Sequence, residues 1–456
     1  MKNQKVQTVD GIRPLGGQAS QRKQKGVFDD LVIASPKRTQ DAMRGWHGFF
    51  PYYAGYPEPF ARSLLASARL GSDAKVVDPW NGSGTTTFSA SQLGLESRGC
   101  DINPVMLIVA RARLLPHSEA DSLEPLAREI VKALRGNQRL VKAKDPLLDW
   151  FTLPTAGLVR ALERRIREHL LGDMVLSTEG IRLEKISGLA ATFYVALFSV
   201  CRDLASAYRS SNPTWIRKPN KDECVVESDR EELLTMFIDN IASMAQALAA
   251  SEAQATKPAN VELSIADTVS LALAENTVDF ILTSPPYCTR IDYAAATRIE
   301  LAVLYPLLGL SMEYLGRRMI GSTRVPTTPI ESNPQWGGTC TRFLRAVKRH
   351  PSKASSGYYY KTHLDYFEKM YVSLTKLSRA LKDRGKAVFV VQDSYYKDVH
   401  NDLPAIIGEM GETMGLQLER RVDFHISQTM AGVNPHSRTY RQASSATESV
   451  LCFQKR

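Results

Sequence analysis

The stretch that most constrains this chain is a short apolar run that ends in two prolines. Residues 278–282 read Val-Asp-Phe-Ile-Leu, which is typical of a buried β-strand. Residues 283–287 then read Thr-Ser-Pro-Pro-Tyr, and because proline has no N–H group the strand must stop there. Open α/β sheets bind their ligands in loops at the carboxyl ends of strands. This stretch therefore predicts an α/β fold with a site at residues 283–287.

The residue types in this loop suit a flat ring that carries an amine. The Ser284 hydroxyl and the Pro285 carbonyl can accept hydrogen bonds from the amine, and the ring of Tyr287 offers a face for stacking. An amine held in this way is drawn toward tetrahedral geometry, which makes its lone pair available for reaction. The alternative interpretation is a Pro-Pro turn that closes a buried strand beside an incidental tyrosine.

A glycine-rich turn follows another short strand much earlier in the chain. Residues 75–87 read Lys-Val-Val-Asp-Pro-Trp-Asn-Gly-Ser-Gly-Thr-Thr-Thr, so the strand ends at Asp78 and the turn opens a helix. Gly82 and Gly84 allow a ligand to approach the backbone closely, and the free N–H groups of the helix suit a carboxylate. No Gly-Lys-Ser/Thr follows, which excludes a Walker loop, and Thr87 stands where a dinucleotide fingerprint has its third glycine.

Two further strands are expected to end at acidic residues. Residues 97–101 form a second strand that ends at Asp101, 23 residues after Asp78. An acid in this position suits hydrogen bonds to ribose hydroxyls. A third strand at residues 261–266 ends at Asp267. The alternative role for an aspartate at a strand end is to cap the helix that follows.

Both loops resemble motifs of the S-adenosylmethionine-dependent DNA amino-methyltransferases, which methylate the N4 amine of cytosine or the N6 amine of adenine. Residues 78–86 are similar to the cofactor loop Asp-Pro-Phe-x-Gly-Ser-Gly-Thr-Thr, with Trp80 in place of Phe. Residues 284–287 resemble the Ser-Pro-Pro-Tyr catalytic motif. Serine in its first position is more usual in the cytosine N4 enzymes, and Asp or Asn in the adenine N6 enzymes. The resemblance covers residues 46–112, 259–300 and 364–455.

This resemblance implies a Rossmann-like, seven-stranded, mostly parallel sheet whose last strand is antiparallel, and S-adenosyl-L-methionine as cofactor. Asp101 would hold the ribose, Asp78 with the glycine loop would hold the methionine part, and Asp267 would lie near the adenine. The full set of implied cofactor residues is Asp78, Pro79, Gly82, Ser83, Gly84, Thr85, Asp101, Asn103 and Asp267. The implied catalytic residues are Ser284, Pro285, Pro286 and Tyr287. They would act by direct transfer to a base turned out of the duplex, without a covalent intermediate.

The charge of the chain indicates a polyanionic partner, which we take to be DNA. The net charge is +10, and residues 1–45 hold nine Lys/Arg against four Asp/Glu while residues 311–361 hold nine against two. Two basic regions on a nearly neutral body favour phosphate contacts, although basic tails also occur in proteins that bind no nucleic acid. The candidate DNA contacts are Arg290, Tyr293, Trp215, Arg317, Arg318, Arg345, Lys348 and Arg349.

The order of these features predicts six segments along the chain. They are a basic flexible arm at 1–45, a cofactor-binding half at 46–114, a helical insertion at 115–255, a catalytic-loop part at 256–310, a basic, loop-rich insertion at 311–361 and C-terminal strands at 362–456. The basic insertion is the first candidate for target recognition. We expect helices at residues 158–166, 236–244 and 364–381, and strands at residues 386–391, 418–426 and 449–453.

Composition narrows the class of protein further. Hydrophobic content of 43% and charged content of 23% are ordinary for a soluble globular protein, and no apolar run approaches the roughly 18 residues of a membrane span. The polar, basic N-terminus lacks a signal-peptide core, so we expect a cytoplasmic protein without a membrane partner. The six cysteines show no Cys-x-x-Cys spacing, and we predict neither a metal site nor a disulfide framework.

Several alternatives to a cytosine N4 enzyme remain open. An adenine N6 enzyme would use the same loop. A cytosine C5 enzyme would need a cysteine nucleophile, and Cys288 lies one residue beyond the position that such enzymes use. RNA guanine N2 methyltransferases share the fold and a similar loop, and a degenerate enzyme could serve as a DNA-binding scaffold. A restriction or defence role with a partner nuclease is what the family often implies.

Overall fold

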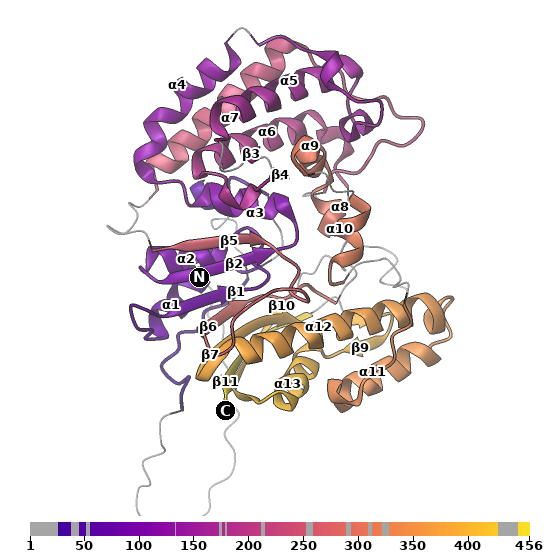
Figure 1. Cartoon of the computed structure of the whole chain (residues 1–456). Helices are drawn as coiled ribbons and strands as arrows, with labels where there is room; N and C mark the ends of the chain where they lie inside the picture. The colour runs from indigo at the N-terminus through magenta and orange to yellow at the C-terminus, as the bar shows by residue number, and fades with distance from the viewer. Residues whose placement is uncertain are drawn as a thin grey trace, which may run out of the picture.

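Runs of β-branched and aromatic residues form a seven-stranded sheet in the computed structural model (Figure 1). In their order across the sheet the strands are β10 (Leu416–Ile426), β11 (Ala446–Lys455), β7 (Leu381–Gln392), β6 (Val278–Thr283), β1 (Lys75–Asp78), β2 (Glu96–Asp101) and β5 (Val261–Ile265). β11 pairs antiparallel with both β7 and β10, and the pairs from β7 to β5 are parallel. The predicted Rossmann-like, mostly parallel sheet with one antiparallel strand is confirmed.

The structure describes most but not all of the chain. The described residues are 26–37, 45–51, 55–132, 134–172, 176–177, 180–210, 215–251, 259–288, 293–308, 312–321, 328–426 and 446–456.

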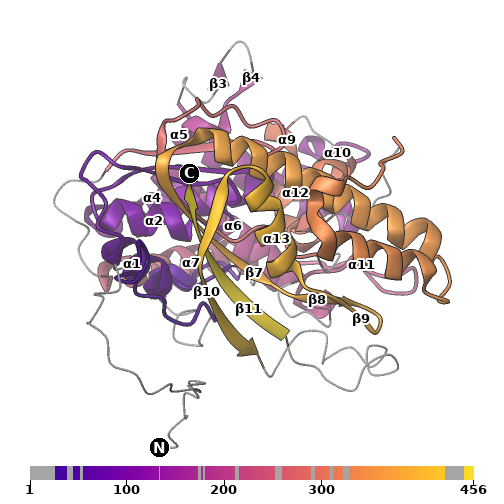
Figure 2. The same ribbon diagram turned by 90° about the horizontal axis from the view of Figure 1, so that it is seen from below.

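Helices cover both faces of the sheet because side chains alternate along each strand. On β7, Val388 and Val390 pack against α1 and α2, whereas Phe389 and Val391 pack against α12 and α13. The bounds of these helices are α1 (Glu58–Ser67), α2 (Thr85–Gln92), α12 (Tyr360–Ala380) and α13 (Leu403–Thr413). Figure 2 shows α12 and α13 over the strands of the C-terminal half. The result is a layer of helices on each side of the sheet.

A second group of helices forms its own hydrophobic core beside β5 (Figure 1). Its members are α3 (Pro104–Arg113), α4 (Ala120–Val131), α5 (Leu153–Leu170), α6 (Gly188–Leu204), α7 (Arg230–Ala249) and α9 (Arg298–Leu308). The helices predicted at residues 158–166 and 236–244 are confirmed as parts of α5 and α7. A two-stranded hairpin, β3 (Leu176–Ser177) and β4 (Gly180–Ile181), lies between α5 and α6 in the chain. None of the described helices combines the length and the apolar character needed to cross a membrane.

A buried arginine joins α5 to α9. Pro306 lies inside α9, and because it has no N–H group it cannot donate to the Ala302 carbonyl one turn earlier. Arg160 of α5 donates instead to the carbonyls of Ala302 at 2.7 Å and Val303 at 2.8 Å. The same guanidinium forms a buried ion pair with Asp145 at 2.7 Å. The side chain of Arg160 in α5 therefore satisfies backbone groups of α9, which follows the loop at residues 284–287.

Two predicted segments differ from the structure. Residues 26–37, placed in a flexible arm, pack Phe28 and Leu31 against α1, and Arg420 donates to the carbonyls of both residues. The apolar cluster around Phe28 was hidden by the polar composition of the arm as a whole. Residues 311–361, predicted to be rich in loops, contain α10 (Met312–Arg318) and α11 (Gly337–Arg349).

Two shorter features complete the description of the C-terminal half. The helix predicted at residues 364–381 begins four residues earlier, as α12. Arg384 lies at an irregularity within β7, where it has a φ of +61°. A hairpin of β8 (Ser394–Tyr396) and β9 (Val399–Asn401) follows β7, and α8 (Tyr293–Ala296) precedes α9.

Replacing Arg160 with methionine tests the link between α5 and α9. We expect Arg160→Met to lower the free energy of unfolding by about 3–5 kcal/mol, because Asp145 and two carbonyls lose their buried partner. The matched control is Arg128→Met, which breaks an exposed ion pair with Glu124 and should cost about 0–1 kcal/mol. Urea unfolding of the three proteins measures both values, and equal losses would contradict the structural role of Arg160.

Candidate active site

A cavity at the carboxyl edge of the parallel strands brings the two predicted loops together. It encloses about 990 Å³ of space, its open mouth included. Its wall combines residues of the glycine turn, of the ends of β2, β5 and β6, and of α8 and α10. Among the predicted site residues its lining includes Asp78, Pro79, Gly82, Ser83, Thr85, Asp101, Asn103, Asp267, Ser284, Pro285, Pro286, Tyr287 and Arg318.

The glycine turn adopts the backbone that its sequence predicts. Gly84 has a φ of +82° and is the N-cap of α2, a left-handed conformation that glycine adopts without strain. A Cβ atom at this position would lie 2.7 Å from the Cβ of Ala110 in α3. Gly84 does not line the cavity, so its role is to let α2 and α3 approach each other. Gly82, which does line it, has a φ of +50°.

Asp101 and Asn103 organise the second wall of the cavity. The carboxylate of Asp101 accepts hydrogen bonds from the N–H groups of Gly82 at 3.0 Å and Asn103 at 2.8 Å. Burial raises the pKa of Asp101 to about 6. Asn103 caps α3 through the Val105 N–H group, and its side-chain amide donates to the Thr297 hydroxyl at 2.8 Å. The N-cap of α3 is thus Asn103 and not Asp101, and Asp101 keeps lone pairs that can accept from a ligand.

The loop at residues 284–287 is held from outside by two side chains of the C-terminal half. The hydroxyl of Tyr366 in α12 donates to the Pro286 carbonyl at 2.8 Å, and that of Ser394 in β8 donates to the Cys288 carbonyl at 3.1 Å. Within the part of the chain that the structure describes, no hydrogen bond reaches the Ser284 hydroxyl or the Pro285 carbonyl. Both residues line the cavity, as the predicted amine site requires.

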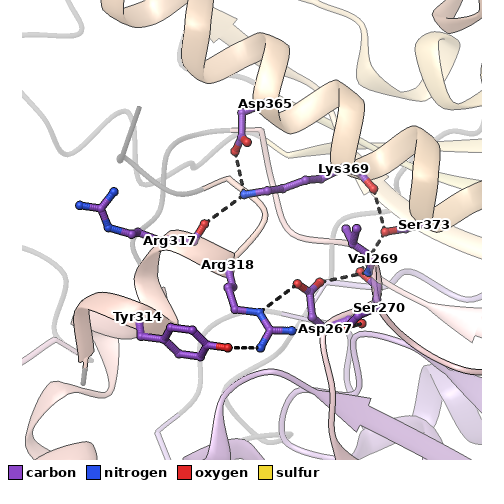
Figure 3. A network of polar contacts seen from close by, with 10 residues as sticks. Asp267, Val269, Ser270, Tyr314, Arg317, Arg318, Asp365, Lys369 and Ser373 are labelled. Atoms are coloured by element: carbon purple, nitrogen blue, oxygen red, sulfur yellow. Dashed lines mark hydrogen bonds and ion pairs between the residues drawn. The ribbon is translucent and has the colours of Figure 1, made fainter. Parts of the chain in front are cut away.

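Figure 3 shows the polar contacts of α10, whose residue Arg318 lines the cavity. Arg318 donates to the Asp267 carboxylate at 3.4 Å and to the Tyr314 hydroxyl at 2.8 Å. Lys369 of α12 pairs with Asp365 at 2.9 Å and donates to the Arg317 carbonyl at 3.2 Å. These contacts attach α10 to β5 on one side and to α12 on the other. Arg318, predicted as a DNA contact, lies in the cavity wall beside a predicted cofactor residue.

The other candidate DNA contacts do not line the cavity. Trp215 lies in the connection between α6 and α7, and Arg317 is exposed at the end of α10. Three further candidates, Arg345, Lys348 and Arg349, are exposed on α11. Arg290 lies outside the described residues, and Tyr293 begins α8, but its side chain is outside them as well.

Cys288 is a poor nucleophile in this structure. Its side chain is 7% exposed and does not line the cavity. Burial raises the pKa of the Cys288 thiol to about 12, so it is protonated at neutral pH. Because the thiolate is the reactive form of cysteine, this environment disfavours cysteine-dependent methylation of a ring carbon.

Several residues that shape the cavity were missed by the sequence analysis. Thr86 and Thr283 both donate to the Asp78 carboxylate at 2.5 Å, and Tyr56 shares a hydrogen bond with Thr86 at 2.6 Å. Thr86 and Thr283 could have been found, because one lies in the cofactor loop and the other directly precedes Ser284. No local pattern points to Tyr366, which lies 80 residues beyond its partner Pro286.

Comparison with known proteins gives a partial match to a methyltransferase. No known protein-family model matches the chain. The Type II methyltransferase M.BsoBI of Geobacillus stearothermophilus is 23% identical over an alignment of 281 residues, which covers 57% of this chain. The chain spans about half the length of this relative, 52%.

Solved structures of methyltransferases align only loosely. A geranyl diphosphate methyltransferase in complex with GPP and sinefungin aligns over 87% of this chain and 77% of its own, with 7% identity and a TM-score of 0.29. The rRNA methyltransferase AviRa from Streptomyces viridochromogenes aligns over 91% of this chain and 94% of its own, with 12% identity and a TM-score of 0.27. The fold assignment therefore rests on the order and direction of the strands themselves.

The close approach of α2 and α3 can be tested with a pair of glycine substitutions. Gly84→Ala should lower the free energy of unfolding by about 2–5 kcal/mol, because a left-handed φ and a steric clash with Ala110 add together. Gly94→Ala is the matched control, since Gly94 also has a positive φ but no atom within 4 Å of the added Cβ. We expect about 1–2 kcal/mol there. Equal losses in urea unfolding would show that crowding at Gly84 is unimportant.

Proposed function

We propose that this chain is an S-adenosylmethionine-dependent DNA methyltransferase that acts on the exocyclic N4 amine of cytosine. The observation that carries the proposal is that one cavity is lined both by the glycine turn and by residues 284–287. A methyl donor and an acceptor ring need to meet at such a junction. The partial similarity to a Type II methyltransferase supports the same activity.

The residues of the cavity fit S-adenosylmethionine. Gly82 allows close approach to the backbone, Asp101 can accept hydrogen bonds from ribose hydroxyls, and Asp267 lies at the end of β5, where the adenine would be held. When bound, the cofactor supplies a methyl group on a positively charged sulfur. Three carboxylates in the lining suit a ligand that carries positive charge and several N–H and O–H donors: Asp78, Asp101 and Asp267.

Ser284 and Pro285 would hold the two N–H groups of the target amine. The Pro286 carbonyl is already occupied by Tyr366, whereas the Pro285 carbonyl borders the cavity without a hydrogen bond among the described residues. Catalysis would consist of positioning and electrostatic stabilisation by these acceptors. The half-buried ring of Tyr287 would stack on a base turned out of the duplex, which is how enzymes reach a base otherwise enclosed in DNA.

Cytosine is favoured over adenine by Ser284 alone, because the resembling enzymes that carry serine there more often act on cytosine. The adenine N6 enzyme is therefore the second candidate, and it would use the same residues. The buried, protonated thiol of Cys288 argues against a cytosine C5 enzyme.

DNA would contact the exposed basic face of α11. Its apolar positions Cys340, Phe343, Leu344 and Val347 are buried. Its exposed positions include Arg342, Arg345, Lys348 and Arg349. A helix that buries one face and presents four cations on the other is suited to contact the phosphate backbone of DNA. Such contacts supply much of the affinity for DNA but do not distinguish one base sequence from another. Figure 1 shows α11 beside α12 and α13, away from the helical group.

The reaction is tested by methyl transfer from labelled S-adenosylmethionine to DNA, with the product digested to nucleosides and analysed by mass spectrometry. The wild type should yield N4-methylcytosine. Ser284→Ala should reduce kcat by about 100-fold or more, because one positioned hydrogen-bonding group is lost. If the product were N6-methyladenine, the target base would be adenine and not cytosine. If the label appeared only in RNA, the substrate would not be DNA.

Stacking on Tyr287 is tested with two substitutions of the same residue. Tyr287→Ala should remove about 1–3 kcal/mol of base stacking and reduce kcat/KM for DNA accordingly. Tyr287→Phe, the matched control, keeps the aromatic face and should retain most activity. If the two variants were equally impaired, the hydroxyl rather than the ring of Tyr287 would matter.

The contribution of α11 is tested by the salt dependence of DNA binding. The double variant Arg345→Gln/Arg349→Gln should bind all DNA sequences more weakly and reduce the slope of log K against log salt by about 2, since each lost phosphate contact reduces it by about 0.9. The control Arg128→Gln/Arg164→Gln removes two exposed arginines from α4 and α5. An unchanged slope in the α11 variant would contradict a role in DNA binding.

A further inference from the structure

The carboxylate of Asp78 is hydrogen-bonded on both oxygens by hydroxyls from different parts of the chain. Its Oδ1 accepts from the Thr283 hydroxyl at 2.5 Å and from the Trp80 N–H group at 3.1 Å. Its Oδ2 accepts from the Thr86 hydroxyl at 2.5 Å. Asp78 is only 3% exposed, although it borders the cavity. Both carboxylate oxygens of Asp78 thus accept hydrogen bonds from the protein itself, whereas the family resemblance implied that Asp78 would hold the cofactor.

These bonds lie where the two central strands leave the sheet. The register pairs of β1 and β6 are Val76 with Phe280 and Val77 with Ile281. Beyond Val77, a side-chain hydrogen bond between the Asp78 carboxylate and the Thr283 hydroxyl connects β1 and β6. Thr283 is fully buried and directly precedes Ser284. The contact therefore joins the start of the cofactor loop to the start of the catalytic loop.

A carboxylate is an uncommon group for a purely structural hydrogen bond when it is as buried as that of Asp78, because burying a charged group is costly. Burial raises the pKa of Asp78 to about 6, and the hydrogen bonds from Thr283 and Thr86 lower it. The titratable groups that face it are Tyr56, before α1, and Cys100 and Asp101 of β2. None of the three carries positive charge at neutral pH, so the hydroxyls and the Trp80 N–H group stabilise the ionised form.

We propose that Thr283 is a positioning residue, which orients Ser284 in the cavity by anchoring the last residue of β6 to Asp78. The catalytic loop then has three anchors: Thr283 at its start, Tyr366 on the Pro286 carbonyl and Ser394 on the Cys288 carbonyl. The contact of Thr283 with Asp78 also fixes the start of the glycine turn, because Asp78 directly precedes Pro79 in the cavity wall. The distance between the methyl donor and the amine acceptors is thereby set by one side-chain contact. The catalytic part of this proposal rests on the proposed function.

Three variants separate positioning from loss of stability. Thr283→Val keeps the shape of the side chain but removes the hydroxyl, and Thr283→Ser restores it. Ile281→Val shortens a fully buried residue of β6 whose apolar side chain cannot hydrogen-bond to Asp78, so it controls for destabilisation of the strand. Thermal unfolding of all variants shows that they are folded at the assay temperature.

The first readout is hydrogen exchange of the peptide that contains the amides of Ser284, Tyr287 and Cys288. In Thr283→Val these amides should exchange at least about threefold faster than in the wild type, while Thr283→Ser and Ile281→Val should match the wild type. This measurement does not depend on the substrate. Unchanged exchange in Thr283→Val would overturn the anchoring role whatever the enzyme methylates.

The second readout is the kinetics of methyl transfer to DNA. Thr283→Val should reduce kcat between about 10- and 100-fold with little change in KM for S-adenosylmethionine, and Thr283→Ser should recover most of it. The hydrogen bond from Thr283 lowers the pKa of Asp78, so its loss in Thr283→Val should raise that pKa. In this variant alone, the acidic limb of the plot of kcat against pH should therefore move to higher pH. A wild type inactive on DNA would refute the proposed function. Normal kcat and an unmoved limb in Thr283→Val would refute the positioning role.

Discussion

The structure depends on the parallel alignment of β1 and β6 at the centre of the sheet. From β1 the chain continues through β2 and β5 on one side, and then returns to β6 and β7 on the other. The order of strands thus reverses between β1 and β6, and such switch points are where open sheets bind ligands. The hydrogen bond between Asp78 and Thr283 lies at this point. The glycine turn and the loop at residues 284–287 are both delivered there by strands that end at one edge.

The helical group is attached to this edge by buried charges as well as by apolar packing. Arg160 satisfies the carbonyl that Pro306 leaves without a donor, and Arg202 of α6 pairs with Glu300 of α9 at 2.5 Å, both side chains being buried. An unpaired buried charge is costly, so these pairs specify how α9 lies against α5 and α6. Since α9 follows the catalytic loop, and Thr297 just before it bonds Asn103, the insertion takes part in shaping the cavity.

Local patterns were sufficient to predict the strands and the loops that follow them. Asp78, Gly82 and Ser284 could be placed because glycine, proline and strand-end acids have positional meaning within a few residues. The contacts that hold these loops could not be predicted, because they join residues far apart in the chain. Tyr366 and Ser394 reach the catalytic loop from 80 and 106 residues away. Burial, hydroxyl geometry and helix packing determine such pairs, and none of these leaves a local signature.

The arginines of the basic insertion lie in two different settings. Its surplus of arginine predicted a DNA surface, but Arg318 lies in the cavity wall with Asp267, where the carboxylate partly neutralises it. The backbone of the same segment approaches the catalytic loop, since a Cβ atom on Gly321 would lie 3.1 Å from the Tyr287 carbonyl. One short stretch thus touches both the predicted adenine end and the predicted base end of the cavity. Its arginines therefore divide by position, with Arg318 in the cavity wall and those of α11 exposed to solvent.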